Sequence, residues 1–236
     1  MSSVSSEFLQ KPFKLKTIFL IYMKKQTILV CVSHSDDQVI GMGSSIAKFS
    51  KEGKNIIVVI FSYGAESVPW LKEKHIIEMR VRESVKIDRF LGAKKTIFLG
   101  LSDKNMEEKI KKFKTEKKLE LIISKYNPEK IFTHALDPHP NHRIVHKTVL
   151  KVLDSMKKNI PVYTFDIWKM FDTKEQKARI YIDTTETFSK KIKAMMMFKS
   201  QMYFSIYPLL PSVYLKAFLN GVHIKTRYAE MFYKER

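Results

Sequence analysis

The feature that most constrains this fold is a regular alternation of short apolar runs and longer segments with helical spacing. Residues 26–33 (QTILVCVS) and 55–62 (NIIVVIFS) are continuous runs rich in β-branched residues, which is typical of strands buried on both faces. The helical segments that follow them end at glycines, Gly53 and Gly92. This alternation with short connections predicts an α/β fold, a mostly parallel sheet with helices on both faces.

The same pattern continues along the chain. We expect further strands at residues 96–99, 130–134, 162–165 and 179–183, and helices at residues 39–52, 70–91, 104–125, 141–158 and 186–203. Residues 204–217 (FSIYPLLPSVYLKA) depart from the pattern, because they combine two prolines with many large apolar side chains. Two interpretations stay open for that segment: an element packed on the sheet or on a neighbouring subunit, and a lid or lipid-facing surface.

The composition excludes several classes of protein. Hydrophobic residues make up 44% of the 236 residues, which is enough for a sizeable core and excludes global disorder. Cys31 is the only cysteine, so the chain can form neither an internal disulfide nor a thiolate zinc cluster, and a reducing compartment is expected. The length suits one domain of this class.

The N-terminal residues carry no targeting signal that we can identify. Residues 18–23 (IFLIYM) form the longest apolar run there, which is shorter than a signal-peptide core and far shorter than a membrane span. Met23 precedes the first strand and is a second candidate start. We therefore expect residues 1–22 to be an extension, residues 23–236 to be a single domain, and the protein to be cytoplasmic.

The chain is strongly basic, with a formal net charge of +19. Its cations are 36 lysines and 7 arginines, whereas specific readers of nucleic acid rely on the planar arginine fork. No zinc-finger spacing or aromatic RNA-binding motif is present. We therefore expect no nucleic-acid partner, and leave open attraction to an anionic membrane surface and assembly into a homo-oligomer.

Three candidate metal-binding or proton-transfer side chains follow the first predicted strand: His34, Asp36 and Asp37. Ligands of doubly wound sheets collect at the carboxyl ends of strands, and a helix N-terminus keeps carboxylates ionised. Because neighbouring side chains on an irregular turn diverge, the economical arrangement has His34 and Asp37 as metal ligands and Asp36 turned toward a metal-bound water. The alternative is an aspartate that only caps the helix.

A second cluster follows the strand predicted at residues 130–134. His139 and His142 stand three apart on a proline-stiffened loop that opens a helix. A catalytic zinc usually takes three protein ligands, so His142 is the predicted third ligand and His139 is placed to face a reacting carbonyl. Surface histidines are one alternative, and a ferrous site is another, because two histidines and a carboxylate also bind non-haem iron. We expect supporting or structural roles for His134 and His146.

These two clusters resemble the motifs of the PIG-L/LmbE-like family of zinc-dependent N-acetylglucosaminyl deacetylases. The family's His-Pro-Asp-Asp-Glu reads here His34-Ser-Asp-Asp-Gln38, and its His-Pro-Asp-His reads His139-Pro-Asn-His142. The resemblance extends over roughly residues 26–232. Weaker matches support it: Arg80 to Glu83, Asp103 after a strand, Asp183, Ser200-Gln201 and Tyr228-Ala229-Glu230.

The resemblance implies a Rossmann-like fold and a reaction, the hydrolysis of the N-acetyl group of an N-acetylglucosamine-type sugar or conjugate by a zinc-bound water. It assigns the metal to His34, Asp37 and His142. It makes Asp36 the general base and His139 the group that stabilises the oxyanion or protonates the leaving amine. Zn²⁺ is the expected cofactor, with Fe²⁺ or another divalent ion as the alternative. Arg80 and Asp103 are implied substrate contacts.

Three positions depart from the family pattern. Ser35 replaces a proline, Gln38 replaces a carboxylate, and Asn141 replaces the aspartate that is expected to support the active-site histidine. The departures leave the ligands and the base intact, so we expect an active enzyme. The alternatives are a sugar-binding relative that has lost catalysis and a binder of nucleic acid or membrane surfaces through the basic surface.

Overall fold

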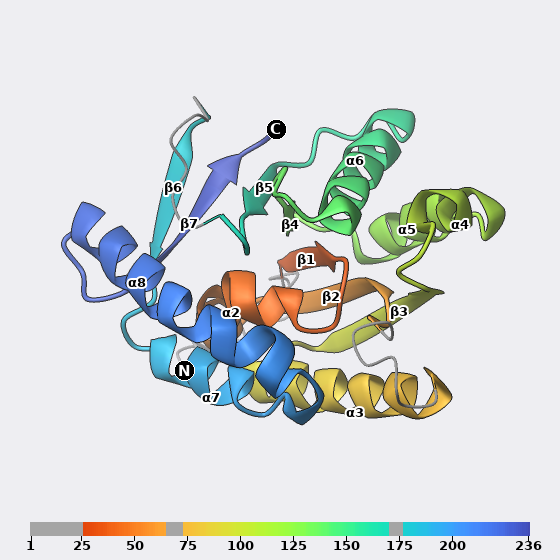
Figure 1. The fold of residues 1–236 in the computed structure, drawn as a ribbon. Helices are drawn as coiled ribbons and strands as arrows, with labels where there is room; N and C mark the ends of the chain where they lie inside the picture. The colour runs from red at the N-terminus through yellow and green to blue at the C-terminus, as the bar shows by residue number, and fades with distance from the viewer. Residues whose placement is uncertain (1–25, 65–72, 170–176) are drawn as a thin grey trace, which may run out of the picture.

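A computed structural model describes residues 26–64, 73–169 and 177–236, so the predicted extension at residues 1–22 lies outside the described residues. Figure 1 shows a central sheet between two layers of helices. The strands are β1 (Thr27–Val32), β2 (Asn55–Ser62), β3 (Lys95–Leu101), β4 (Lys130–His134), β5 (Val162–Phe165), β6 (Arg179–Asp183) and β7 (Ala229–Lys234). The α-helices are α2 (Asp37–Lys51), α3 (Glu73–Leu91), α4 (Met106–Lys112), α5 (Thr115–Tyr126), α6 (Pro140–Ser155), α7 (Phe188–Met195) and α8 (Tyr207–His223).

The sheet has seven strands in the order β3-β2-β1-β4-β5-β7-β6. The pairs from β3 to β5 are parallel, and β7 is antiparallel to both β5 and β6. The predicted α/β class with a mostly parallel sheet is therefore confirmed. The chain moves outward from β1 through β2 to β3 and then returns to the other side of β1 as β4. This reversal places a ligand-binding crevice at the carboxyl ends of β1 and β4.

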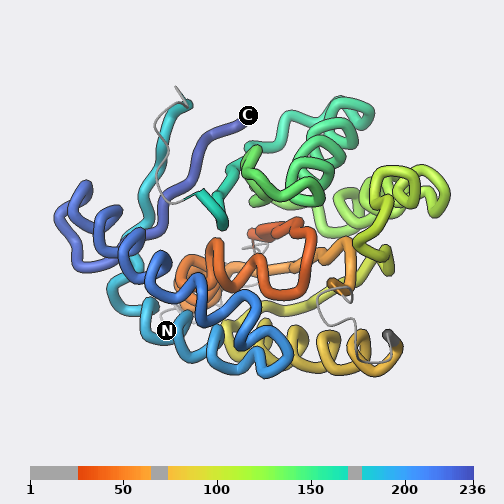
Figure 2. Tube along the Cα trace, viewed as in Figure 1, coloured from red at the N-terminus to blue at the C-terminus, as the bar shows by residue number. Residues whose placement is uncertain are grey.

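Alternation along the buried strands divides the core into two clusters, one on each face of the sheet. From β1, Ile28, Val30 and Val32 pack with residues of α2, α3, α7 and α8, whereas Leu29 and Cys31 pack with residues of α4, α5 and α6. The tube in Figure 2 shows these two helix layers on either side of the sheet. Every residue of β1 is buried, which explains its continuous apolar sequence.

The helix predicted at residues 104–125 is wrong as a single element, because the structure has α4 and α5 with a break at Phe113 and Lys114. Lys114 has a positive φ of 51°. The apolar spacing explains the break. Met106 and Ile110 are buried in α4, and the buried stripe of α5 starts five residues later at Thr115. A continuous helix would have turned that stripe away from the core.

The C-terminal part also differs from the prediction. The helix expected at residues 186–203 ends after α7, and a 3₁₀ turn (Lys199–Gln201) and a π turn (Met202–Ile206) lead into α8. The segment 204–217 is mostly the start of α8, whose Leu209, Val213 and Ala217 join the core. The segment therefore packs on the core beside the sheet, in agreement with the first of the two interpretations. Strand β7 was not predicted.

Candidate metal centre and active-site pocket

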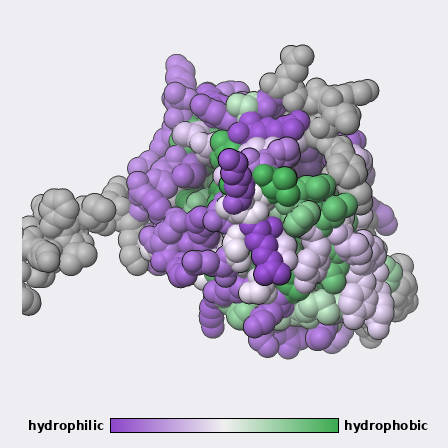
Figure 3. All heavy atoms as spheres, turned by 90° about the vertical axis from the view of Figure 1, so that its left-hand side faces the viewer, coloured by the Kyte–Doolittle hydropathy of each residue, from purple (hydrophilic) through white to green (hydrophobic). Residues whose placement is uncertain are grey.

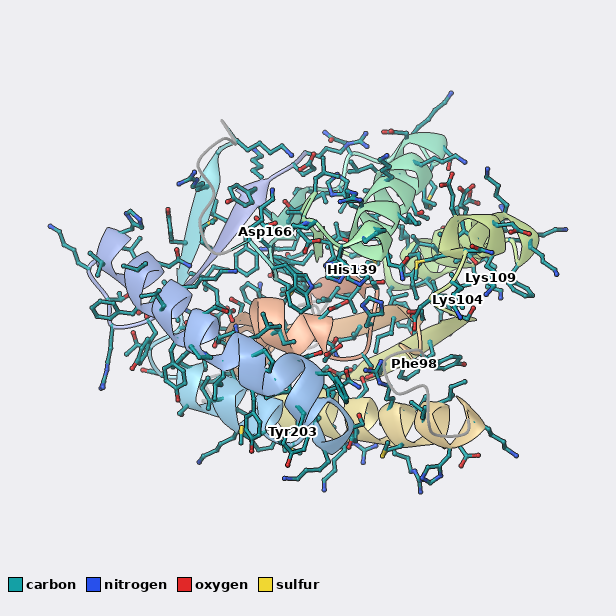
Figure 4. All side chains as sticks on the ribbon, in the orientation of Figure 1. Phe98, Lys104, Lys109, His139, Asp166 and Tyr203 are labelled. Carbon is teal, nitrogen blue, oxygen red and sulfur yellow. The ribbon has the colours of Figure 1, made fainter. Side chains whose placement is uncertain are left out.

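The predicted site residues meet in one pocket at the carboxyl ends of β1 and β4. The pocket has a volume of about 510 Å³. In Figure 4, His139 lies near the centre of the molecule, at the start of α6. The polar lining of the pocket includes all eight side chains that the sequence analysis predicted as site residues: His34, Asp36, Asp37, Arg80, Asp103, His139, Asn141 and His142.

The loop after β1 is folded by its own side chains. The backbone N–H of His34 donates to Asp37 Oδ2 at 2.7 Å, which turns the Asp37 carboxylate back toward the loop. Asp36 stands at the N-cap position of α2, but its side chain makes no capping hydrogen bond. The capping role considered for this aspartate is therefore absent from the structure, and the Asp36 carboxylate faces the pocket instead.

Three potential ligand atoms converge on one point. Asp37 Oδ2 lies 3.2 Å from His34 Nδ1 and 3.4 Å from His142 Nε2, and one ligand atom of each residue lies within 4.8 Å of the other two. Ligands at about 2.0–2.1 Å from a tetrahedral zinc stand about 3.3 Å apart. His142 Nε2 is buried and has no hydrogen-bond partner among the described residues. A buried imidazole nitrogen without a hydrogen-bond partner, close to a carboxylate and a second imidazole, fits a zinc or ferrous ion held by these three residues once His142 gives up its proton.

Asp137 and His134 support this group, and the sequence analysis assigned no role to Asp137. Asp137 Oδ2 lies 2.7 Å from His142 Nδ1 and accepts its proton in a hydrogen bond, which leaves Nε2 for a metal. The His134 ring stacks on the His142 ring with centroids 3.8 Å apart, and His134 Nε2 accepts the Ser33 N–H at 2.9 Å. The only signal for Asp137 was its place between a strand end and His142.

Charges in the centre reinforce one another. Burial opposes ionisation of Asp37, but His142, His34 and His134 hold the pKa of its carboxyl well below its usual range. Burial likewise opposes a charge on His142, yet Asp37 and the hydrogen bond to Asp137 raise the pKa of His142 to about 10. These residues form a buried ion pair, and a metal that bound there would displace a proton from His142.

Asp36 and His139 line the same pocket as the three candidate ligands. Burial, and then the charge of Asp37, raise the pKa of Asp36 above its ordinary value. His139 Nδ1 accepts the backbone N–H of Asn141 at 3.2 Å, so the proton of the neutral ring is on Nε2. The rings of His139 and His142 stack with centroids 4.5 Å apart.

Arg80 and Asp103 line the pocket on the side of β2 and β3. Arg80 is 3% exposed, and its Nη1 donates to the backbone oxygen of Tyr63 at 3.0 Å. Gly64 has a positive φ, and a Cβ there would collide with the Arg80 guanidinium, so this loop needs glycine. Asp103 accepts from Ser62 Oγ at 2.6 Å and lies 3.6 Å from His34 Nε2, which places it beside a candidate ligand.

The three departures from the family pattern are accommodated locally. The oxygen of Ser35 accepts from Gln38 Nε2 at 3.1 Å and from Ser84 Oγ at 3.3 Å, which fixes the loop that lacks the proline. Gln38 Nε2 also donates to buried Asp88 at 2.9 Å, where a glutamate would repel that carboxylate. Asn141 supports His139 through its backbone N–H, which donates to His139 Nδ1. The side-chain amide of Asn141 does not contact His139 and donates instead to the backbone oxygen of Asp103 at 3.2 Å.

The wall of the pocket nearest α8 comes from the C-terminal part of the chain. Gln201, Ser205 and Leu209 contribute to the lining. Glu83 of α3 anchors this segment by accepting the backbone N–H of Ser200 at 3.1 Å. The Arg80–Glu83 pair of the sequence pattern thus has two separate jobs, one in the pocket and one in holding its wall.

Comparisons with known proteins agree with this geometry. The family model described as PIG-L, GlcNAc-PI de-N-acetylase, matches residues 29–153. An uncharacterized deacetylase of Escherichia coli K12, YaiS, is 24% identical over 154 residues, which are 63% of this chain and 79% of that protein. The residues matched by the family model include the three candidate ligands and Asp36.

Solved structures share the fold. The N,N'-diacetylchitobiose deacetylase of Pyrococcus horikoshii has a TM-score of 0.74 at 22% identity, covering 93% of this chain and 86% of that chain. A zinc-inhibited form of the teicoplanin deacetylase Orf2 has a TM-score of 0.70 at 17% identity, covering 88% and 97%. GalB, a 4-carboxy-2-hydroxymuconate hydratase of Pseudomonas putida KT2440, has a TM-score of 0.75 at 22% identity, covering 89% and 96%. With its family model matched over more than half of its length, the chain belongs to the PIG-L family of de-N-acetylases.

Proposed function

We propose that this protein is a metal-dependent hydrolase that removes the N-acetyl group from an N-acetylglucosamine-type sugar or sugar conjugate. One observation carries the proposal: the ligand atoms of His34, Asp37 and His142 converge beside Asp36 and His139 in a single pocket. The products would be acetate and a free amine, since water adds to the amide carbon and the C–N bond breaks.

In this proposal, His34, Asp37 and His142 hold the metal. A bound Zn²⁺ would lower the pKa of a water and polarise the amide carbonyl. Asp36 removes a proton from the attacking water, for which its raised pKa is suited. Because His139 Nδ1 accepts the backbone N–H of Asn141, the Nε2–H of His139 is left to donate to the carbonyl oxygen as negative charge develops there.

Arg80 and Asp103 suit contacts with a hydroxylated substrate. Both line the pocket opposite the C-terminal wall, and one offers donors whereas the other offers acceptors. The Arg80 guanidinium is held in place by its Nη1 hydrogen bond to the backbone oxygen of Tyr63. A sugar hydroxyl in the pocket would therefore meet a fixed donor. Residues 65–72, which follow Gly64 in sequence, lie outside the described residues.

GalB supports a second candidate, because a hydratase shares this fold at a TM-score of 0.75. A hydratase adds water to a carbon–carbon double bond, whereas a deacetylase adds it to an amide. The family match at residues 29–153 favours the deacetylase. A sugar-binding protein without catalysis is the third candidate, and it would bind the same ligands without releasing acetate.

The test combines metal content with product analysis. The purified protein should contain close to one equivalent of zinc or iron by elemental analysis. It should release acetate from members of a panel of N-acetylated sugars that are free, nucleotide-linked, thiol-linked or lipid-linked. A His142→Ala variant should lose the metal, and a Glu186→Gln variant on the exposed surface should keep both properties. A protein that never takes up metal, or that binds these sugars without releasing acetate, would overturn the proposal.

A further inference from the structure

Helix α8 has two apolar faces, although a helix on the surface of a protein needs one. Leu209, Val213, Ala217 and Gly221 are buried against the core. The other face is also apolar and is exposed: it consists of Tyr207, Tyr214, Leu215, Phe218, Leu219 and Val222. We call these six residues the outer face of α8. Figure 3 looks at the end of the molecule where α8 and β6 lie and shows hydrophobic residues bordered by hydrophilic ones.

The charged residues of the segment that carries this face have a single sign. From Thr187 to Ala229 the sequence contains six lysines and one arginine, and no aspartate or glutamate. Lys191 is buried and paired with Glu230, so it does not contribute to the surface. Lys199 precedes the outer face, Lys225 and Arg227 follow it, and all three are exposed. An apolar strip is thus flanked by exposed cations, and the nearest acidic residue in sequence, Glu230, is buried and paired with Lys191.

We propose that the outer face of α8 docks on an anionic lipid surface. Its apolar side chains would enter the boundary between headgroups and acyl chains, and its flanking cations would contact the anionic headgroups. Tyr207 and Tyr214 suit that boundary, because tyrosine presents an apolar ring and a polar hydroxyl. Among the helices of the described residues, none has both the length and the apolar content to cross a bilayer. Helix α8 would lie in the membrane surface.

Charge favours a lipid surface over a second copy of the chain. The protein carries a formal net charge of +19, and a symmetric dimer through this face would bring two acid-free segments together. An anionic bilayer attracts the same segment. The binding should therefore weaken as salt screens the flanking cations.

Docking would bring the active-site pocket close to the membrane. Leu209, which is in the first turn of α8, lines that pocket together with Gln201 and Ser205. Tyr203, which is 77% exposed, has its ring centroid 5.6 Å from that of Tyr207 in the outer face. Figure 4 shows Tyr203 on the side of the molecule that carries α8. The candidate ligands come from the loop after β1, the start of α2 and α6, so the docking surface and the reaction centre can be tested separately.

The experiment measures sedimentation of the full chain with vesicles. We expect binding to phosphatidylcholine vesicles in which a third of the lipid is phosphatidylserine, weaker binding at high salt, and much weaker binding to phosphatidylcholine alone. Phe218→Ser/Val222→Ser should lower the partition coefficient about tenfold. Lys225→Gln/Arg227→Gln should lower it about fivefold for each cation removed, on anionic vesicles only.

Matched controls lie on the opposite helix layer. Leu121→Ser removes a side chain that is 62% exposed on α5, and Lys111→Gln/Lys112→Gln removes two cations from α4. These variants should bind vesicles like the parent. All variants should keep their circular dichroism and bound metal, because the altered residues are outside the pocket.

Three results would overturn the proposal. The parent protein could fail to bind the anionic vesicles, or the two pairs of α8 variants could bind them as well as the controls do. Light scattering could instead show a dimer at low salt that becomes a monomer in Phe218→Ser/Val222→Ser, in which case a second copy covers the outer face.

Discussion

Two buried charged clusters lie near α2, and they differ in how completely their polar atoms are paired. In the first, Lys191 Nζ donates to Glu230 Oε1 at 2.7 Å, and the Glu230 carboxylate also accepts the backbone N–H groups of Ser44 and Ser45. In the second, Asp37 lies among three imidazoles, and within the part of the chain that the structure describes Nε2 of His142 has no hydrogen-bond partner.

The difference separates a structural role from a ligand-binding one. The Lys191–Glu230 cluster joins α7 and β7 to α2 and leaves the Glu230 carboxylate satisfied at both oxygens. The cluster at Asp37 holds an imidazole nitrogen that is not paired by a hydrogen bond in the described residues, and it opens into a pocket. Removal of a charge should therefore reduce stability at the first cluster and function at the second.

The largest effect is expected from Asp36→Asn. The change should lower the turnover number about 10²–10⁴-fold, because amide nitrogen cannot accept the proton of the attacking water. Metal content should stay the same, and stability should not fall, because burial already opposes the charge of Asp36. Acetate release and elemental analysis of the same sample check both statements. Full activity in metal-replete buffer would show that Asp36 is not the base.

Glu230→Gln tests the Lys191–Glu230 cluster, which we call the closed cluster because both carboxylate oxygens are paired. Lys191 is 3% exposed, so the change would leave a buried ammonium beside a neutral amide and should lower the free energy of unfolding by about 3–5 kcal/mol. Urea unfolding measures this loss. The double change Lys191→Met/Glu230→Leu should recover most of it. Metal content per folded molecule should be unchanged throughout, and its loss would contradict the separation of the two clusters.

Asp88→Asn tests a buried charge between these extremes. Burial raises the pKa of Asp88 to about 6, although its carboxylate accepts hydrogen bonds from Gln38 and Thr96. Because the carboxyl takes up a proton more readily in the folded state, its contribution to stability falls as the pH rises from about 4 through about 6. Asp88→Asn should therefore raise the free energy of unfolding at pH 7 by up to about 3 kcal/mol.

The gain from Asp88→Asn should shrink as the pH falls and vanish below about pH 3, where both states hold the proton. Urea unfolding at a series of pH values gives the profile. Thr96 can reverse its hydroxyl to accept from the new amide, so the hydrogen bonds survive. A gain that did not change with pH would mean that the charge of Asp88 is not its cause.

The sheet could be predicted from the sequence because its signal is local. Strands β2, β4, β5 and β6 have the bounds expected from their apolar runs. The ends of β1 and β4 then determine which loops meet, so His34 and His142 could be placed together from topology alone. The parallel part of the fold needed no knowledge of distant contacts.

Features that depend on distant contacts could not be predicted. Strand β7 is buried on most of its length only because it pairs with β5 and β6, and its sequence AEMFYK has no clear strand pattern. The helix expected after β6 ends at Met195 because the segment that follows is anchored by Glu83. The role of Asp137 was missed for the same reason, since an aspartate before a proline reads as an ordinary turn residue.

Asp137→Asn gives the smallest expected effect. It is the sharpest test of the cluster at Asp37, which we call the open cluster because it lines the pocket. Asp137 Oδ1 accepts the backbone N–H of His139 at 2.9 Å, and its Oδ2 accepts the Nδ1–H of His142 at 2.7 Å. An asparagine has one acceptor oxygen for these two donors. If the oxygen keeps the His139 contact, the amide donates to His142 Nδ1 and moves the ring proton to Nε2, where it blocks the metal.

Metal affinity of Asp137→Asn should therefore fall about 10–100-fold, as measured by competition with a chelator. Asp154→Asn is the matched control, because that exposed carboxylate pairs with Arg236 and should leave the affinity unchanged. Acetate release by Asp137→Asn should recover when metal is added in excess, since Asp36 and His139 remain in place. An affinity equal to that of the parent would mean that Nε2 of His142 is free for a ligand without help from Asp137, and the open cluster would then depend on Asp37 and His34 alone.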